Sequence, residues 1–145
     1  MAKRADSDEH YVLDLCDEVL GVPGRRQATF EWLRGDPSPS RPFGTKLPVD
    51  GYWPTLRLVV EVQERQHTEA VPFFDRRQTV SGIGRGEQRR LYDQRKMEAI
   101  PANGLRLVVI HKAEFTVRAD KIVRVPERDL MAVRGRLTPG VGPLR

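Results

Sequence analysis

Residues 47–67, LPVDGYWPTLRLVVEVQERQH, decide the fold of this chain. The stretch predicts two strands joined by a turn at residues 51–54. The second strand, residues 56–63, is nearly all apolar and rich in β-branched side chains, which is typical of a strand buried on both faces. We therefore expect a sheet at the centre of the molecule, with other elements packed against both of its faces.

One acidic residue interrupts the apolar run. Glu61 lies in the middle of the predicted strand, where an unpaired carboxylate would be costly to bury. Side chains alternate along a strand, so Glu61 and Gln63 project to one face, and a hairpin brings Asp50 back towards it. Two converging carboxylates are what a hard cation such as Mg²⁺ takes from a protein. The alternative is a structural ion pair between Glu61 and either Arg57 or Arg106.

Length, charge and cysteine content indicate the number of domains, the kind of partner and the location of the protein. The chain has 145 residues, which suits one domain over residues 1–135 and a flexible C-terminal tail over 136–145. Its 25 basic and 20 acidic residues give a net charge of +5, which favours a polyanionic partner such as nucleic acid. The single cysteine, Cys16, excludes an internal disulfide and indicates a reducing, cytoplasmic location. No apolar run approaches the roughly 18 residues of a membrane span, so we expect no membrane association.

The order of predicted elements gives the fold class. Residues 8–20 form the clearest helix, and Glu18 beside its apolar stripe is expected to lean over the sheet as a third metal-binding carboxylate. The alternative for Glu18 is a place on a solvated acidic face. The other elements are expected as a strand at 27–33, a surface loop at 35–44, a helix at 87–100, a strand at 105–110, an edge strand at 121–125 and a helix at 126–134. This order predicts an α/β fold, a mixed sheet flanked by helices.

Two segments carry candidate nucleic-acid contacts. The loop over residues 68–81 combines basic and aromatic side chains, which can follow a phosphate backbone and stack on bases. The helix at 87–100 carries cations at roughly helical spacing. The alternatives are that the phenylalanines of the loop enter the core and that the helix is simply a solvated, charge-rich element. The candidate nucleic-acid contacts are Arg76, Arg77, Arg85, Arg89 and Tyr92.

The order of these motifs resembles the PD-(D/E)XK nuclease superfamily. Within it the chain is most similar to the very-short-patch-repair endonucleases and their small bacterial relatives. Their pattern is an Asp, an apolar strand with Glu-x-Asp-Gly-x-x-His, a helix with Asp-x-x-Arg, and a Gly before the next strand. Asp50, Glu61 and His67 match the two acids and the histidine. Asp93 and Lys96 resemble the helix signature, with Lys in place of Arg.

The resemblance implies a restriction-endonuclease-like core and an Mg²⁺- or Mn²⁺-dependent endonuclease whose partner is DNA. Asp50 and Glu61 would hold the metal ion, and His67 would act as a general base or position water. Gln63 stands where the superfamily has lysine, and Glu-x-Gln also occurs among its active members. Gln63 can bind the attacking water but supplies no charge, so Lys96 on the following helix, or a second metal ion, would replace that charge.

Three readings of the function remain open from the sequence. The first is an endonuclease that nicks DNA, or that cuts both strands as a homodimer because each chain has one site. The second is a nucleic-acid-binding module that keeps the nuclease fold without catalysis. The third is a subunit of a larger DNA-processing system whose specificity domain lies on another polypeptide.

Overall fold

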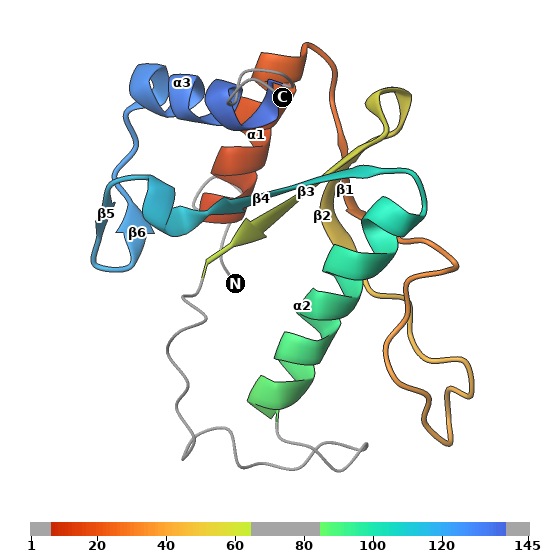
Figure 1. The fold of residues 1–145 in the computed structure, drawn as a ribbon. Helices are drawn as coiled ribbons and strands as arrows, with labels where there is room; N and C mark the ends of the chain where they lie inside the picture. Colours follow the sequence, from red (N-terminus) through yellow and green to blue (C-terminus); the bar gives the residue numbers. More distant parts are fainter. Residues whose placement is uncertain (1–6, 65–84, 139–145) are drawn as a thin grey trace.

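The computed structural model describes residues 7–64 and 85–138, and its fold is a mixed four-stranded sheet flanked by three helices (Figure 1). This confirms the predicted α/β class. The elements are α1 (Asp8–Leu20), β1 (Arg25–Ala28), β2 (Val49–Trp53), β3 (Leu58–Gln63), α2 (Arg85–Ala102), β4 (Arg106–His111), β5 (Val117–Arg118), β6 (Lys121–Ile122) and α3 (Pro126–Leu137), with short 3₁₀ turns at η2 (Pro54–Leu56) and η3 (Lys112–Glu114). Among the described residues, no helix is long and apolar enough to cross a membrane.

The sheet has the strand order β1-β2-β3-β4. The β1–β2 and β2–β3 pairs are antiparallel, whereas β3 and β4 are parallel. Parallel neighbours require a crossover connection, and α2 lies on the crossover between β3 and β4. This connection matters for the site, because it lays one helix across the sheet face towards which Glu61 points.

Strand β3 is buried between two hydrophobic clusters. On one face, Val60 joins a cluster with residues of α1 and α3; on the other, Val59 packs with Ile100 of α2. Figure 1 shows α1 and α3 together on one side of the sheet and α2 on the other. Every residue from Leu58 to Val62 is buried, which confirms the prediction of a strand covered on both faces.

Several strand boundaries differ from the prediction. The turn predicted at residues 51–54 comes later, at η2. Residues 51–53 still pair with β3, and the chain reverses where Arg57 takes a left-handed φ of 51°. The strand predicted at 27–33 ends at Ala28, since Leu33 N–H bonds to Phe30 O in a local turn. A strand does begin at Lys121, but it ends at Ile122 and pairs with β5 in a separate hairpin, so its predicted place at the edge of the main sheet is wrong.

Both later helices run further than predicted. Helix α2 extends from Arg85 to Ala102, and the proline at 101 lies within its last turn. Helix α3 ends at Leu137, which is buried in the cluster with α1, so the packed part of the chain passes the expected boundary at residue 135. The expected tail beyond Thr138 lies outside the described residues.

Candidate active site

Asp50 and Glu61 lie next to each other across the β2–β3 pair. The backbone N–H of Asp50 donates to Glu61 Oε2 at 2.9 Å, and the backbone N–H of Val62 donates to Asp50 Oδ2 at 2.8 Å. Each carboxylate is thus oriented by a backbone amide of the opposite strand. The hairpin brings these two predicted acids together, as the alternation of side chains and the turn between the strands suggested.

Lys96 of α2 supplies the positive charge at this acid pair. Its Nζ lies 3.0 Å from Glu61 Oε1 and 2.9 Å from the carbonyl oxygen of Pro48. The side chains of Lys96 and Glu61 are only 16% and 8% exposed, so their ion pair is largely shielded from water. The predicted alternative, a pair with Arg57 or Arg106, is wrong.

The two arginines point elsewhere because both lie at the far end of the β3–β4 pair from Glu61. Arg57 Nε donates to the carbonyl oxygen of Gly104, and Arg106 Nη1 donates to that of Leu137. They join β3 and β4 to the connection before β4 and to the end of α3. Within the described structure, the cation that reaches Glu61 is therefore carried by the crossover helix.

Burial raises the pKa of both acids. For Asp50 the main cause is loss of hydration, opposed by the hydrogen bond from Val62 N–H and by the charge of Lys96. For Glu61 loss of hydration comes first and repulsion from Asp50 second, again opposed by Lys96. When both acids are ionised they carry more negative charge than one lysine neutralises, so a divalent cation beside them would favour that state.

A third acid, Glu9, approaches from the first turn of α1. The amide Nε2 of Gln27 donates to Glu9 Oε2 at 3.1 Å and lies 3.5 Å from Asp50 Oδ1. Burial, followed by repulsion from Asp50 and then Glu64, raises the pKa of Glu9 to about 7. Glu9 is therefore a group that can gain or lose a proton near neutral pH, next to the acid pair.

Glu18, the predicted third carboxylate, is not part of this cluster. The Glu18 side chain is exposed. A helix has 3.6 residues and 5.4 Å per turn, so Glu18, nine residues after Glu9, lies about 13 Å further along α1 and on the opposite side of the helix. The sequence does contain the signal for Glu9. Val12, Leu13 and Cys16, at three, four and seven residues after it, are all fully buried, so Glu9 belongs to the stripe that faces the sheet.

Glu9→Gln is expected to make the protein about 1 kcal/mol more stable at pH 8 and to leave it unchanged at pH 4, after allowance for solvent screening. The folded pKa of about 7 exceeds the ordinary 4.5, so this group favours folding fully below pH 4.5 and loses that contribution as pH rises through 7. Urea unfolding at both pH values measures the difference. Glu18→Gln, on the same helix, should change neither value by more than about 0.5 kcal/mol; equal behaviour of the two variants would contradict this placement of Glu9.

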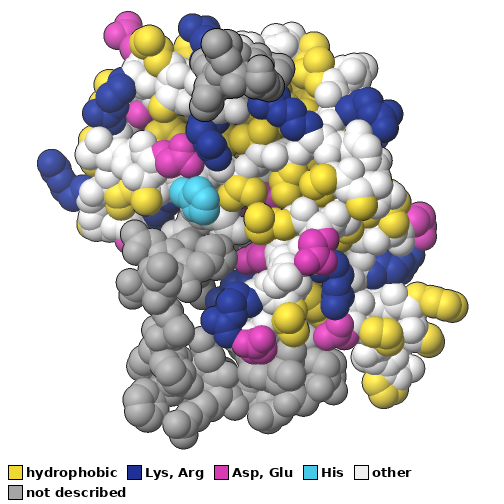
Figure 2. Space-filling view, in the orientation of Figure 1, with side chains coloured by type: hydrophobic (Ala, Val, Ile, Leu, Met, Phe, Trp, Pro, Cys, Tyr) yellow, Lys and Arg dark blue, Asp and Glu magenta, His cyan; other side chains and the backbone are white. Residues whose placement is uncertain are grey.

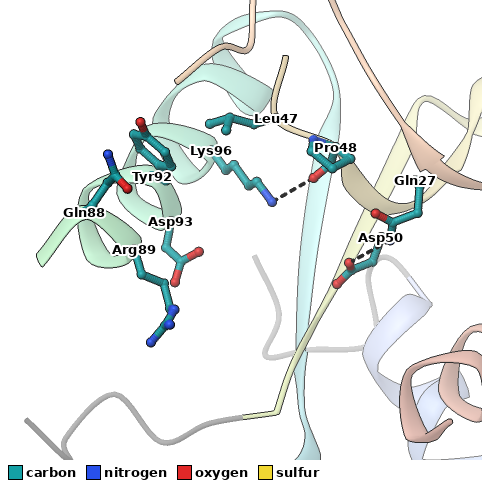
Figure 3. A pocket seen from close by; sticks show the side chains of 9 residues that line it. All are labelled: Gln27, Leu47, Pro48, Asp50, Gln88, Arg89, Tyr92, Asp93 and Lys96. Carbon is teal, nitrogen blue, oxygen red and sulfur yellow. Dashed lines mark hydrogen bonds between the residues drawn. The ribbon is translucent and has the colours of Figure 1, made fainter. Parts of the chain in front are cut away.

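A pocket of about 500 Å³ opens beside the acid pair, between α2 and the strands β1 and β2 (Figure 3). Figure 3 shows Asp50 on the strand side, with Lys96, Asp93 and Arg89 extending from α2 towards the same space. The volume is in the range of ordinary ligand sites. The lining residues are Gln27, Leu47, Pro48, Asp50, Gln88, Arg89, Tyr92, Asp93 and Lys96.

Tyr92, a predicted nucleic-acid contact, lines the pocket and also holds a loop in place. Its hydroxyl accepts a hydrogen bond from the backbone N–H of Asp36 at 2.9 Å, and the guanidinium of Arg95 lies 5.1 Å above its ring. Arg95 also donates to the carbonyl oxygen of Arg34 and to Asp36 Oδ1. Together these contacts fasten the proline-rich loop after β1 to α2, along one side of the pocket.

Several cations of α2, among them Lys96 of the predicted stripe, are compensated by acids. Lys96 pairs with Glu61, Arg90 with Glu87 in the preceding turn, and Arg95 with Asp36. Figure 2 shows Lys and Arg side chains interspersed with Asp and Glu over the visible face, without a continuous basic area. Arg89 is exposed and lines the pocket, so it keeps a position from which it can reach a ligand.

The remaining predicted site residues divide into two groups. Gln63 ends β3, is half-buried and shares the strand face of Glu61. His67, Arg76 and Arg77 lie outside the described residues, as does the side chain of Arg85. Of the predicted residues, the structure therefore places Asp50, Glu61, Gln63, Lys96, Arg89 and Tyr92 at the acid pair and its pocket, and it adds Glu9 and Gln27.

The donor set fits a hard divalent cation. Across the residues that the structure describes, no group of three or more His, Cys, Asp or Glu side chains is placed to hold a metal ion. Mg²⁺ seldom needs one, because it usually takes one or two carboxylates and fills its other positions with water and substrate phosphate oxygens. Asp50 and Glu61 supply such a pair, with raised pKa values that a nearby cation would lower.

Comparison with known proteins gives no match: no protein-family model fits the chain, and neither the curated proteins nor the solved structures include a similar one.

Proposed function

We propose that this protein is a metal-dependent endonuclease that hydrolyses phosphodiester bonds in DNA, with a sheet and helix arrangement of the restriction-endonuclease type. The observation that carries the proposal is the meeting of Asp50, Glu61 and Lys96 beside an open pocket. Lys96 restores from α2 the positive charge that Gln63 does not supply on β3. The order of motifs along the sequence supports the same assignment.

The roles of the side chains follow from their positions. Asp50 and Glu61 would hold Mg²⁺ or Mn²⁺, which when bound supplies Lewis acidity towards the scissile phosphate. Lys96 would stabilise the negative charge that develops on the phosphate oxygens as water adds and the phosphorus–oxygen bond to the leaving group breaks. Glu9 can accept the proton of the attacking water, since its pKa of about 7 leaves it partly ionised at neutral pH. Gln63 can hydrogen-bond that water.

The partner of this protein is inferred from its charge, and its assembly from the single proposed site in each chain. Arg89 at the pocket and the net charge of +5 favour a polyanion. A chain with one site nicks a single strand, so cutting both strands requires two copies in a homodimer. A cytoplasmic location is part of the proposal, because it fits the buried, unpaired thiol of Cys16.

Incubation of supercoiled plasmid with purified protein and Mg²⁺ or Mn²⁺ tests the proposal. The wild type is expected to produce nicked or linear DNA, and Glu61→Ala is expected to reduce the rate by at least about 10²–10³-fold, because it removes both a metal-binding oxygen and the partner of Lys96. Glu18→Ala is the matched control, an exposed acid outside the site, and should cut like the wild type. Gel electrophoresis of time courses gives the rates.

Other outcomes separate the alternatives. Equal cutting by the wild type and Glu61→Ala would place the activity at another site or in a contaminant. Binding of DNA that persists in chelator, without cleavage under either metal, would replace the endonuclease with a binding module. Plasmid, linear and single-stranded DNA all left intact and unbound would overturn the proposal.

A further inference from the structure

Gln27 has a backbone conformation that its place in a strand does not explain. It lies within β1, whose flanking residues Arg26 and Ala28 pair regularly with Gly51 and Val49. Its φ is 54°, in the left-handed region that side chains other than glycine adopt at an energetic cost. Strain of this kind persists where the surroundings determine it, and it concentrates at functional sites.

The side chain of Gln27 shows what this conformation accomplishes. Its Nε2 lies 3.1 Å from Glu9 Oε2 and 3.5 Å from Asp50 Oδ1, so one amide group joins the acid from α1 to the acid from β2. Gln27 also lines the pocket, and Figure 3 shows its side chain against Asp50. The amide of Gln27 is uncharged. It can therefore orient two carboxylates without neutralising the negative charge that would attract a metal ion, as a lysine or arginine would.

We infer that Gln27 is a positioning residue: its left-handed backbone aims one amide at two acids, and so orients Asp50 for a divalent cation and Glu9 for the proton of the attacking water. This inference rests on the proposed metal-dependent function. Both hydrogen bonds that the structure gives the Gln27 side chain go to acids of the site. Residues that orient metal-binding groups without touching the metal are typically worth 10–100-fold in affinity.

Gln27→Gly separates the two roles that Gln27 can have. Glycine adopts the left-handed conformation freely, so the melting temperature of the variant should equal or exceed that of the wild type. Loss of the amide should weaken Mn²⁺ binding to the full-length protein at least about 10-fold, measured by electron paramagnetic resonance in the absence of DNA. Raising the Mg²⁺ concentration should restore DNA cleavage in Gln27→Gly and leave Glu61→Ala inactive.

Ala119→Gly is the matched control for backbone strain. Ala119 has a φ of 52° in the exposed turn between β5 and β6, away from the acids. The control should gain stability in the same way and bind Mn²⁺ like the wild type.

Three results would overturn the inference. A lower melting temperature in Gln27→Gly would mean that the side chain serves the fold, and Mn²⁺ affinity within two- to threefold of the wild type would mean that its amide does not prepare the site. A wild type that binds no Mn²⁺ at all would overturn the proposed function, and the role of Gln27 with it. The first two results leave the proposed function standing, so the two failures are distinguishable.

Discussion

Asp50→Asn is expected to abolish metal-dependent DNA cleavage and, at the same time, to make the protein more stable by about 1 kcal/mol at pH 8. Loss of activity follows from loss of a charged metal-binding oxygen. The gain in stability follows from the pKa, because burial raises it in the folded state and ionisation of Asp50 therefore opposes folding. The asparagine oxygen can still accept the hydrogen bond from Val62 N–H that holds the side chain in place.

The sign of this effect gives a clear pH dependence. An acid with a raised pKa contributes fully to stability below its unfolded value and loses that contribution as pH rises through its folded value. The gain from Asp50→Asn should therefore shrink towards zero near pH 4, which urea unfolding at pH 4 and pH 8 measures. Asp14→Asn, an exposed acid that pairs with Arg26, should change stability by less than about 0.5 kcal/mol at either pH. Lower stability of Asp50→Asn at pH 8 would refute the argument.

Lys96→Met is expected to destabilise the protein by about 3 kcal/mol at pH 8 and to reduce cleavage at least about 100-fold. Without the lysine, the buried carboxylate of Glu61 has lost its cation and still lies next to Asp50. Removing one partner of a buried ion pair is among the more destabilising substitutions. The loss should be smaller at pH 5, because the raised pKa of Glu61 allows it to take up a proton in place of the lysine charge.

The control for this prediction lies on the same helix. Arg90 is exposed and pairs with Glu87 one turn earlier, so Arg90→Met should cost no more than about 0.5 kcal/mol at either pH. Lys96→Arg keeps the charge and should recover part of the stability at pH 8. If Lys96→Met is as stable as Arg90→Met at pH 8, then the acid pair does not depend on α2.

The sequence predicted the centre of the fold better than its edges. Strand β3 could be predicted because an apolar run covered on both faces leaves a strong local signal. Strand β1 has no such signal, because its side chains alternate between exposed and half-buried. The aromatic residues that suggested a longer strand stack on one another instead: the ring centroids of Phe30 and Trp32 are 4.5 Å apart. Likewise, nothing local tells whether β6 pairs with the main sheet or with β5.

The candidate site was predictable where it depends on one hairpin. The convergence of Asp50 and Glu61 follows from strand alternation and one turn, and Lys96 was suggested by the charge missing at Gln63. Glu18 was predicted as the third acid and Glu9 was not considered, although Glu9 lies on the buried stripe of α1 at the end of the helix that reaches the acid pair. Gln27 left no signal, since its backbone conformation depends on contacts with residues distant in the sequence.

The position of Lys96 on the crossover between β3 and β4 also sets the order in which the site assembles during folding. Asp50 and Glu61 are 11 residues apart, within a single hairpin, whereas Lys96 and Glu61 are 35 residues apart. Local hairpins close before long connections, because the entropy of closing a loop rises with its length. We therefore expect a refolding chain to bring its two acids together before the lysine arrives, and the docking of α2 then gives Glu61 its cation. The charge balance of the acid pair thus depends on the most distant of its contacts along the chain, the one that the crossover between β3 and β4 supplies.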